Sequence, residues 1–210
     1  KSWSLLWNEK YAGNILQYNN PRDAFATAMF WKGLDINSDD PAVWDEALEV
    51  LKEQKPLLQG YVNDEIFNKM EGGSAAIAAY YAGDYLAMYE SNEDLEFFYP
   101  KEGTNLYVDA MCIPKSSKNP EIAKAYINFM LSEEPAIANA EFICYASPNT
   151  LVSSNSDYLD YMGEDACEIL YGTEGHNPLD VNKEYNEKYG TTCYKNFTPE
   201  IQSRVNTLWE

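Results

Sequence analysis

ILQYNNPRDAFATAMFWKG, residues 15–33, carries the clearest fold signal in this chain. Its first four residues, Ile15 to Tyr18, predict a short strand. Asn20 then stands at a helix-capping position, Pro21 suits the first helical position, and Gly33 ends the apolar pattern. The stretch therefore predicts a strand followed directly by a helix, which is the building unit of an α/β protein.

The rest of the chain repeats this alternation. Asp40-Pro41 gives a second helix-start signal, and Thr198-Pro199 starts the last helix. We expect residues 147–180 to be loop-rich with short helices. The further predicted strands are 60–62, 75–80, 95–99 and 107–113, and the further predicted helices are 41–54, 64–70, 83–89, 120–131 and 132–142. Strands alternating with helices predict an α/β sheet covered on both faces.

The composition indicates a globular protein with an acidic surface. The 210 residues are 45% hydrophobic, and 15 basic against 34 acidic side chains give a formal net charge of -19. Such a charge disfavours nucleic acid and anionic membranes as partners, because both attract Lys and Arg. It favours a cationic partner, although surplus acidic side chains also simply keep a protein soluble.

Several classes of protein are disfavoured by what the sequence lacks. The longest apolar run, 122–131, contains Lys124 and Asn128 and is far shorter than the roughly 20 residues of a membrane span. Glycine-rich phosphate loops and nucleophile elbows are absent. His176 is the sole histidine, and the four cysteines are each more than twenty residues apart. Because Lys1 replaces an initiator Met, we expect the natural chain to start upstream.

Acidic and aromatic residues cluster just after predicted strands, where open α/β sheets bind ligands. Carboxylates beside aromatic faces suit an organic ammonium group. Tyrosines are also common in cores, and an aspartate at a helix start is usually a cap. A paired-carboxylate glycosidase and a phenolate iron site at Tyr80-Tyr81 stay open as alternatives. The candidates are Asn20, Asp23, Tyr80, Tyr81, Asp84, Tyr107 and Asp109.

An ordered series of motifs over residues 1–150 resembles the spermidine/putrescine-binding proteins of bacterial ABC importers, and the tail resembles them more loosely. Each motif is modest, but their order and spacing are specific. The motifs are Ser2-Trp3, Leu6-Trp7, Tyr11, Gly13, Ile15, the Asn20 to Asp23 turn, Tyr99-Pro100-Lys101-Glu102-Gly103, Tyr107-Val108-Asp109, Ile113-Pro114, Asn119-Pro120 with Ala123, Ile127-Asn128-Phe129, and Tyr145-Ala146-Ser147-Pro148-Asn149.

The resemblance implies a periplasmic-binding-protein-like (type II) α/β fold of two lobes, with the first part of lobe one missing. Residues 1–107 would form the main part of lobe two, 108–149 would return to lobe one, and 150–210 would complete lobe two. Without its sheet neighbours, the 108–149 segment is expected to be poorly ordered, or to pair an exposed strand edge with another copy of the chain.

The resemblance also implies the ligand-binding residues. The positions that match the family's contacts are Asn20, Asp23, Tyr81, Tyr107, Asp109 and Tyr145. Asp109 would pair with a ligand ammonium, while Tyr81 and Tyr107 would sandwich the carbon chain. Three features depart from the family: Asn20 replaces an Asp, Tyr81 and Tyr107 replace Trp, and the last contact would fall near Lys195 or Asn196.

The function implied is that of an extracytoplasmic solute-binding protein, periplasmic or membrane-anchored, without a cofactor and without enzymatic activity. It would capture putrescine or spermidine, dock on the membrane permease of an ABC importer, and bind no nucleic acid. Two alternatives remain at this point. The same fold could bind another cation, either ferric iron or thiamine, or the carboxylates could serve a hydrolase.

Overall fold

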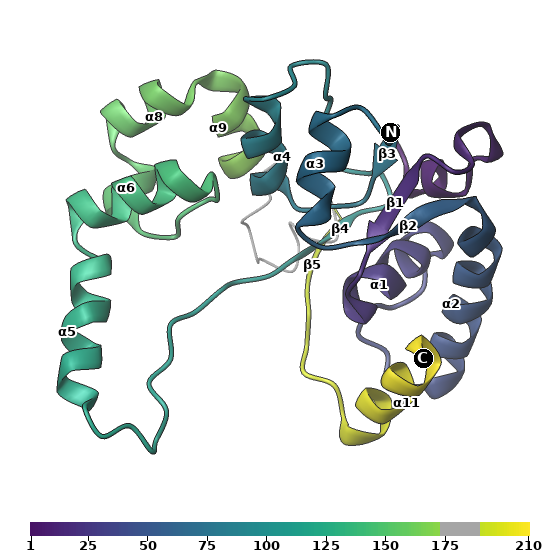
Figure 1. The fold of residues 1–210 in the computed structure, drawn as a ribbon. Helices are drawn as coiled ribbons and strands as arrows, with labels where there is room; N and C mark the ends of the chain where they lie inside the picture. The colour runs from purple at the N-terminus through teal and green to yellow at the C-terminus, as the bar shows by residue number, and fades with distance from the viewer. Residues whose placement is uncertain (173–189) are drawn as a thin grey trace. The chain divides into compact units, whose positions relative to one another are not determined.

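The computed structural model describes residues 1–172 and 190–210, which form helices and short strands in alternation (Figure 1). The chain divides into two compact units. As far as these ranges are described, the first unit comprises Lys1–Tyr81, Met88–Leu106 and Asp180–Glu210, and the second comprises Ala82–Ala87 and Tyr107–Leu179.

A parallel sheet of three strands forms the centre of the first unit. β1 (Ile15–Tyr18) lies between β2 (Leu58–Val62) and β3 (Ile77–Ala78). Parallel neighbours need a crossover connection, and helices supply it on both sides of β1. The central position of β1 explains why all four of its residues are buried. The predicted strand over 15–18 is confirmed, whereas the one predicted over 75–80 is limited to β3.

The helices between these strands begin where the capping signals predicted. In α1 (Pro21–Lys32), the Asn20 side chain accepts a hydrogen bond from the backbone N–H of Arg22 at 2.9 Å. The helix ends at Gly33, whose φ of 70° is easy only for glycine. α2 (Pro41–Gln54) starts with the same kind of cap from Asp40. Short 3₁₀ helices over Trp3–Trp7, Glu9–Tyr11 and Lys55–Leu57 connect the larger elements.

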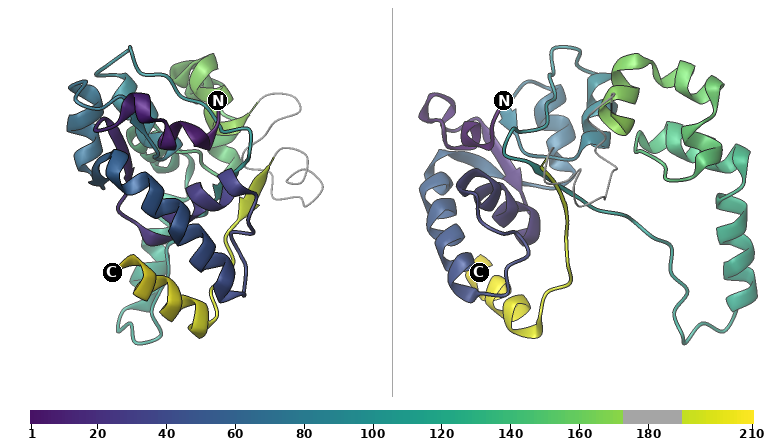
Figure 2. Two further views of the ribbon diagram at one scale, coloured as in Figure 1. Left: turned by 90° about the vertical axis from the view of Figure 1, so that its right-hand side faces the viewer. Right: turned by 180° about the vertical axis from the view of Figure 1, so that it is seen from behind.

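Helices cover both faces of the central sheet, as the alternating pattern predicted. On one face, α1 and α2 pack with the C-terminal helix α11 (Pro199–Trp209), and all three lie side by side in Figures 1 and 2. Their shared core contains Trp44, which is 1% exposed. On the other face, Leu16 packs with Ile66 of α3 (Glu65–Glu71) and with Met88. Met88 lies near the end of α4 (Ala82–Tyr89).

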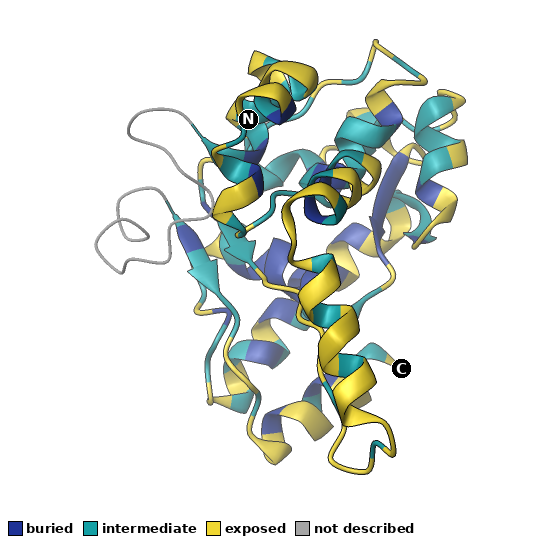
Figure 3. Ribbon diagram, turned by 90° about the vertical axis from the view of Figure 1, so that its left-hand side faces the viewer, coloured by how far each residue is buried: buried dark blue, intermediate teal, exposed yellow. Residues whose placement is uncertain are grey.

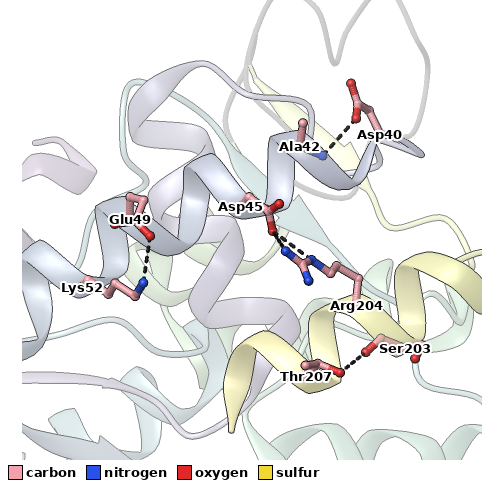
Figure 4. A network of polar contacts seen from close by, with 8 residues as sticks. All are labelled: Asp40, Ala42, Asp45, Glu49, Lys52, Ser203, Arg204 and Thr207. Atoms are coloured by element: carbon pink, nitrogen blue, oxygen red, sulfur yellow. Dashed lines mark hydrogen bonds and ion pairs between the residues drawn. The ribbon is translucent and has the colours of Figure 1, made fainter.

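A charged pair fastens α11 to α2 (Figure 4). Both Nε and Nη2 of Arg204 donate to Oδ1 of Asp45, at 2.9 and 2.6 Å. The pair is close to half exposed, so we expect it to stabilise the fold by no more than about 1 kcal/mol. The apolar contacts of α11 therefore dominate its attachment to the first unit.

A second, two-stranded sheet brings distant parts of the sequence together. β4 (Thr104–Leu106) pairs in parallel with β5 (Thr191–Cys193). At its start, Gly103 meets Gly190 so closely that a Cβ on either residue would overlap the other's backbone. The backbone N–H of Thr104 donates to the Gly190 carbonyl at 2.8 Å. Two glycines are therefore required where these strands come together.

The second unit is built from helices in the part of the chain that the structure describes. Ala136 and Ala140 of α6 (Glu133–Ile143) pack with Val152 and Tyr158 in a small core. The predicted helices over 120–131 and 132–142 are confirmed, and short helices follow as expected up to Tyr171. The elements are α5 (Pro120–Met130), α6 (Glu133–Ile143), α7 (Thr150–Ser153), α8 (Ser156–Met162) and α9 (Glu164–Tyr171).

α5 has an unusual surface. None of its residues is buried, and Ile122, Tyr126 and Phe129 are all more than half exposed. Figure 3 views this side and shows the helix yellow along most of its length. Phe142, near the end of α6, is 88% exposed. A helix with apolar residues on most of its circumference is normally covered. The second unit therefore presents a large apolar surface.

Two predicted strands are wrong. Residues 95–99 form no strand, and Phe97 and Tyr99 instead meet through their rings, 5.0 Å apart and edge to face. Residues 107–113 also form no strand, because β4 ends at Leu106 and no strand pairs with this segment in the described ranges. Val108 is 72% exposed there. Strand-forming residues adopt a ladder only where a neighbouring strand completes it.

Over residues 1–172 and 190–210, none of the helices has the length and apolar character needed to cross a membrane.

Candidate functional site

Asp23 lies in the first turn of α1, directly after the central strand of the sheet. Its side chain is 7% exposed although it is an acid. The acidic position in the first turn suits the positive end of the helix dipole. The cap at Asn20 and the ring of Pro21 fix the start of this helix, and they thereby fix where the carboxylate points.

Two tyrosine hydroxyls donate to this buried carboxylate. The hydroxyl of Tyr81 lies 2.9 Å from Oδ2 of Asp23. The hydroxyl of Tyr194 lies 2.8 Å from Oδ1. Tyr81 stands immediately before α4, and Tyr194 follows β5, so that widely separated segments meet at one side chain. A carboxylate has about four lone-pair positions, and two remain for a further donor.

Burial and hydrogen bonding both affect the pKa of the Asp23 carboxyl. It raises the pKa of Asp23, and the hydrogen bonds from Tyr194 and Tyr81, together with the charge of Arg22, act in the opposite direction. Burial raises the pKa of Tyr194 far above its usual range, with Asp23 adding to the effect. Tyr194 therefore stays protonated at neutral pH and remains a hydrogen-bond donor to Asp23.

Tyr81, which donates to the carboxylate, belongs to a cluster of three tyrosine rings. Tyr81 is 5.1 Å from Tyr18 and 4.8 Å from Tyr80 between ring centroids, and Tyr18 stacks on Tyr80 at 5.7 Å. The rings belong to the end of β1 and to the segment that follows β3. A carboxylate next to clustered phenol faces provides both an ionic partner and cation–π attraction for an ammonium group.

Arg22 is the cation next to Asp23. Its guanidinium lies 4.3 Å from the ring centroid of Tyr194 and 3.6 Å from that of Phe197. Burial lowers the pKa of Arg22, although an arginine remains charged at neutral pH. This pair partly balances the charge in the first turn of α1.

A second group of predicted residues meets within the second unit. Tyr145 is hydrogen-bonded to both Tyr107 and Asp84. Burial, with further contributions from these two groups, raises the pKa of Tyr145 far above its usual range. The ring lies against Gly83, and a Cβ at that glycine would overlap it. Cys144 precedes it with a φ of 57°, a left-handed conformation that turns the chain after α6.

The remaining two predicted residues lie in different settings. The Asn20 side chain caps α1, so one of its oxygen lone pairs is used inside the helix start. Asp109 lies exposed in the extended segment that follows β4. Thus the structure brings Asp23 and Tyr81 together in one unit, and Tyr107 and Tyr145 together in the other. His176, the sole histidine, lies outside the described residues.

Sequence reasoning missed Tyr194. The last ligand contact was predicted near Lys195 or Asn196, and both of these residues are exposed. Tyr194, one position before Lys195, donates to the Asp23 carboxylate. The strand-forming run Thr191 to Tyr194 was the available signal, but nothing local identifies a partner 171 positions away.

Over 1–172 and 190–210, His, Cys, Asp and Glu side chains form no group of three or more that could hold an ion. At Asp23 the described side chains bring one carboxylate together with the hydroxyls of Tyr81 and Tyr194.

The sequence was compared with family models and with known proteins. Residues 1–162 match the family described as bacterial extracellular solute-binding protein. The chain is 31% identical over 148 residues to the spermidine/putrescine-binding periplasmic protein of Salmonella typhimurium. It is 29% identical over 160 residues to a putrescine/cadaverine-binding protein of Pseudomonas aeruginosa. These matches cover 70% of this chain, and 42% and 44% of those relatives.

Solved structures agree with this match. A putative spermidine/putrescine ABC transporter protein from Listeria monocytogenes superposes with a TM-score of 0.83 at 28% identity. The spermidine/putrescine substrate-binding protein of Streptococcus pneumoniae gives a TM-score of 0.75, also at 28% identity. Each match covers 99% of this chain and 60% of the other. The predicted periplasmic-binding-protein-like fold is confirmed, and the chain spans about two-fifths of the length of its curated relatives.

Proposed function

Because the chain belongs to the bacterial extracellular solute-binding proteins, we propose that it captures a polyamine, putrescine or spermidine, for uptake by an ABC importer. It acts outside the cytoplasm, as its family does, and delivers the ligand to a membrane permease. No bond is made or broken, and its role is that of a binding protein rather than an enzyme.

The buried carboxylate of Asp23 carries this proposal. Its two phenol donors orient it and leave lone pairs on both oxygens for a ligand N–H. The ring of Tyr81 lies at the carboxylate and belongs to a cluster with Tyr18 and Tyr80, and an aromatic ring beside a carboxylate suits a cation and its methylene groups. An ammonium head on an apolar chain matches these features, and the curated relatives are named for ligands of this kind.

The first turn of α1 supplies one carboxylate, because Asn20 is neutral and serves as a cap. This reduces the negative charge available to one end of the ligand. If polyamines fail to bind, the alternative ligands are therefore another organic cation, such as thiamine, or ferric iron.

Titration calorimetry of the complete natural protein that carries residues 1–210 tests the proposal. We expect one of putrescine and spermidine to bind with a micromolar or lower Kd, and thiamine and ferric citrate to give no heat. Asp23→Asn should weaken that binding, while Asp39→Asn, at an exposed position, removes the same charge and should leave it unchanged. Binding of thiamine or iron without polyamine binding would overturn the assignment of the ligand.

A further inference from the structure

A short segment between β5 and α11 is held against the first unit by the side chain of Asn37. Oδ1 of Asn37 accepts the backbone N–H of Lys195 at 2.8 Å, and Nδ2 donates to the carbonyl of Cys193 at 2.9 Å. These backbone groups belong to the two neighbours of Tyr194. Asn37 therefore fixes the chain on both sides of that tyrosine.

Arg22 holds the same segment from the start of α1. Its Nη2 donates to the carbonyl of Lys195 and to Oδ1 of Asn37, both at 3.0 Å. Its planar guanidinium also lies over the rings of Tyr194 and Phe197. Stacking and directed hydrogen bonds from one rigid group restrict a neighbouring ring better than a flexible lysine can.

We infer that Arg22 and Asn37 are positioning residues for the ligand site, because together they hold Tyr194 where its hydroxyl meets Asp23. The consequence for ligand affinity rests on the proposed function. The action on Tyr194 itself does not depend on which ligand binds.

The reason lies in the freedom of an unsupported tyrosine. If the segment moves, the hydroxyl of Tyr194 is less often within reach of Oδ1, and Asp23 loses one of its two phenol donors. The groups that act on the Asp23 carboxyl are Tyr194, Tyr81 and Arg22. With burial, Tyr81 and the arginine charge unchanged, loss of the Tyr194 bond raises the pKa of Asp23 and favours the protonated acid, which binds an ammonium poorly.

Two variants test this without changing the charge of the site. Asn37→Ala removes both backbone contacts, and Arg22→Lys keeps the cation but removes the planar stack. Carbon NMR of the Asp23 carboxyl, recorded without ligand, is the readout. In both variants the pKa of Asp23 should rise, as it should in Tyr194→Phe. Arg204→Gln is the matched control, because it frees α11 from Asp45 and should leave the Asp23 titration unchanged.

A double-mutant cycle between Asn37 and Tyr194, measured by polyamine affinity, provides the second test. Asn37→Ala should weaken polyamine binding about tenfold near the pH where Asp23 titrates, which is the order of one charge-assisted hydrogen bond. In a protein that already carries Tyr194→Phe, adding Asn37→Ala should not weaken polyamine binding further. The reason is that Asn37 acts on Asp23 through the Tyr194 hydroxyl, which that variant lacks. An unchanged Asp23 titration in both single variants, or fully additive losses, would overturn the inference. If no polyamine binds even the unaltered protein, the proposed function fails while the titration still tests the positioning role.

Discussion

The hydroxyl of Tyr194 lies 2.8 Å from Oδ1 of Asp23, although the two residues are 171 positions apart in the chain. The contact places the C-terminal part of the sequence at the same carboxylate as Tyr81. It makes the ionisation of Asp23 depend on both segments.

The pH dependence of ligand binding should follow Asp23. Its pKa is raised above 3.8 by burial, so the carboxylate is lost at a higher pH than an exposed aspartate would be. An ammonium ligand binds the ionised form, and affinity should therefore fall as the pH falls through this raised pKa. Calorimetric titrations between pH 8 and pH 4 measure it. An affinity that stays constant until the pH approaches 3.8 would contradict the prediction.

The contribution of Asp23 to the free energy of unfolding should change with pH in the opposite direction to ligand affinity. The folded carboxyl holds its proton more tightly than the unfolded one. Its contribution to folding is thus most favourable below the unfolded pKa and is lost as the pH rises through the folded pKa. At neutral pH, Asp23→Asn should lower the free energy of unfolding by less than about 1 kcal/mol while it weakens ligand binding. Urea unfolding at pH 7 checks this, and a much larger loss would count against it.

Asp109 is predicted to pair with a ligand ammonium. In the complete natural protein, Asp109→Ala should weaken polyamine binding by about 2–5 kcal/mol, because a desolvated ammonium would lose its partner. Asp157→Ala, at another exposed position in the second unit, is a suitable control. A loss below about half a kcal/mol would remove Asp109 from the site.

Gly83 should tolerate no side chain. A Cβ there overlaps the ring of Tyr145, which would have to leave its hydrogen bonds with Tyr107 and Asp84. We expect Gly83→Ala to lower the free energy of unfolding by about 1–3 kcal/mol, as overpacking does. At Gly60 a Cβ meets no atom within 4 Å, so Gly60→Ala serves as the control in the same urea titration. Equal stability of the two variants would refute the steric argument.

The apolar surface of the second unit should be detectable in solution. Ile122, Phe129 and Phe142 are more than half exposed, and such surfaces bind hydrophobic dyes or associate. The 210-residue chain should bind the dye ANS, and Ile122→Gln with Phe129→Gln should reduce its fluorescence. Sedimentation measurements would also show any association with another copy. Unchanged fluorescence in the double variant would indicate that the dye binds elsewhere.

Helices were predictable in this chain because their signals are local. Asn20 and Asp40 stand where they cap α1 and α2, and each precedes a proline at the first helical position. Strands were less predictable, since a ladder depends on neighbours distant in sequence. The run over 107–113 has strand-forming residues but no strand beside it in the described ranges, so sequence pattern alone gave the wrong structure.

The residues of the candidate site likewise include some that could be predicted from local sequence signals and some that could not. Asp23 and Tyr81 were predicted from their positions after strands, and the structure places them in hydrogen-bond contact. Asn37 could not be identified, because besides Arg22 its side chain bonds to backbone groups of Cys193 and Lys195, which carry no sequence signature. A side chain that binds another segment's backbone is recognisable only once that segment has been placed.

The parallel pairing of β4 with β5 has a consequence for how the protein is synthesised. Residues 107–179 of the second unit leave the ribosome after β4 and before β5. The first unit therefore cannot close its two-stranded sheet, or add α11 to its core, until the residues of β5 and α11 are available. Contacts between such distant residues slow folding, because a long loop must close first. Until Tyr194 has been added to the first unit, the Asp23 carboxylate has only one of its two tyrosine donors, Tyr81.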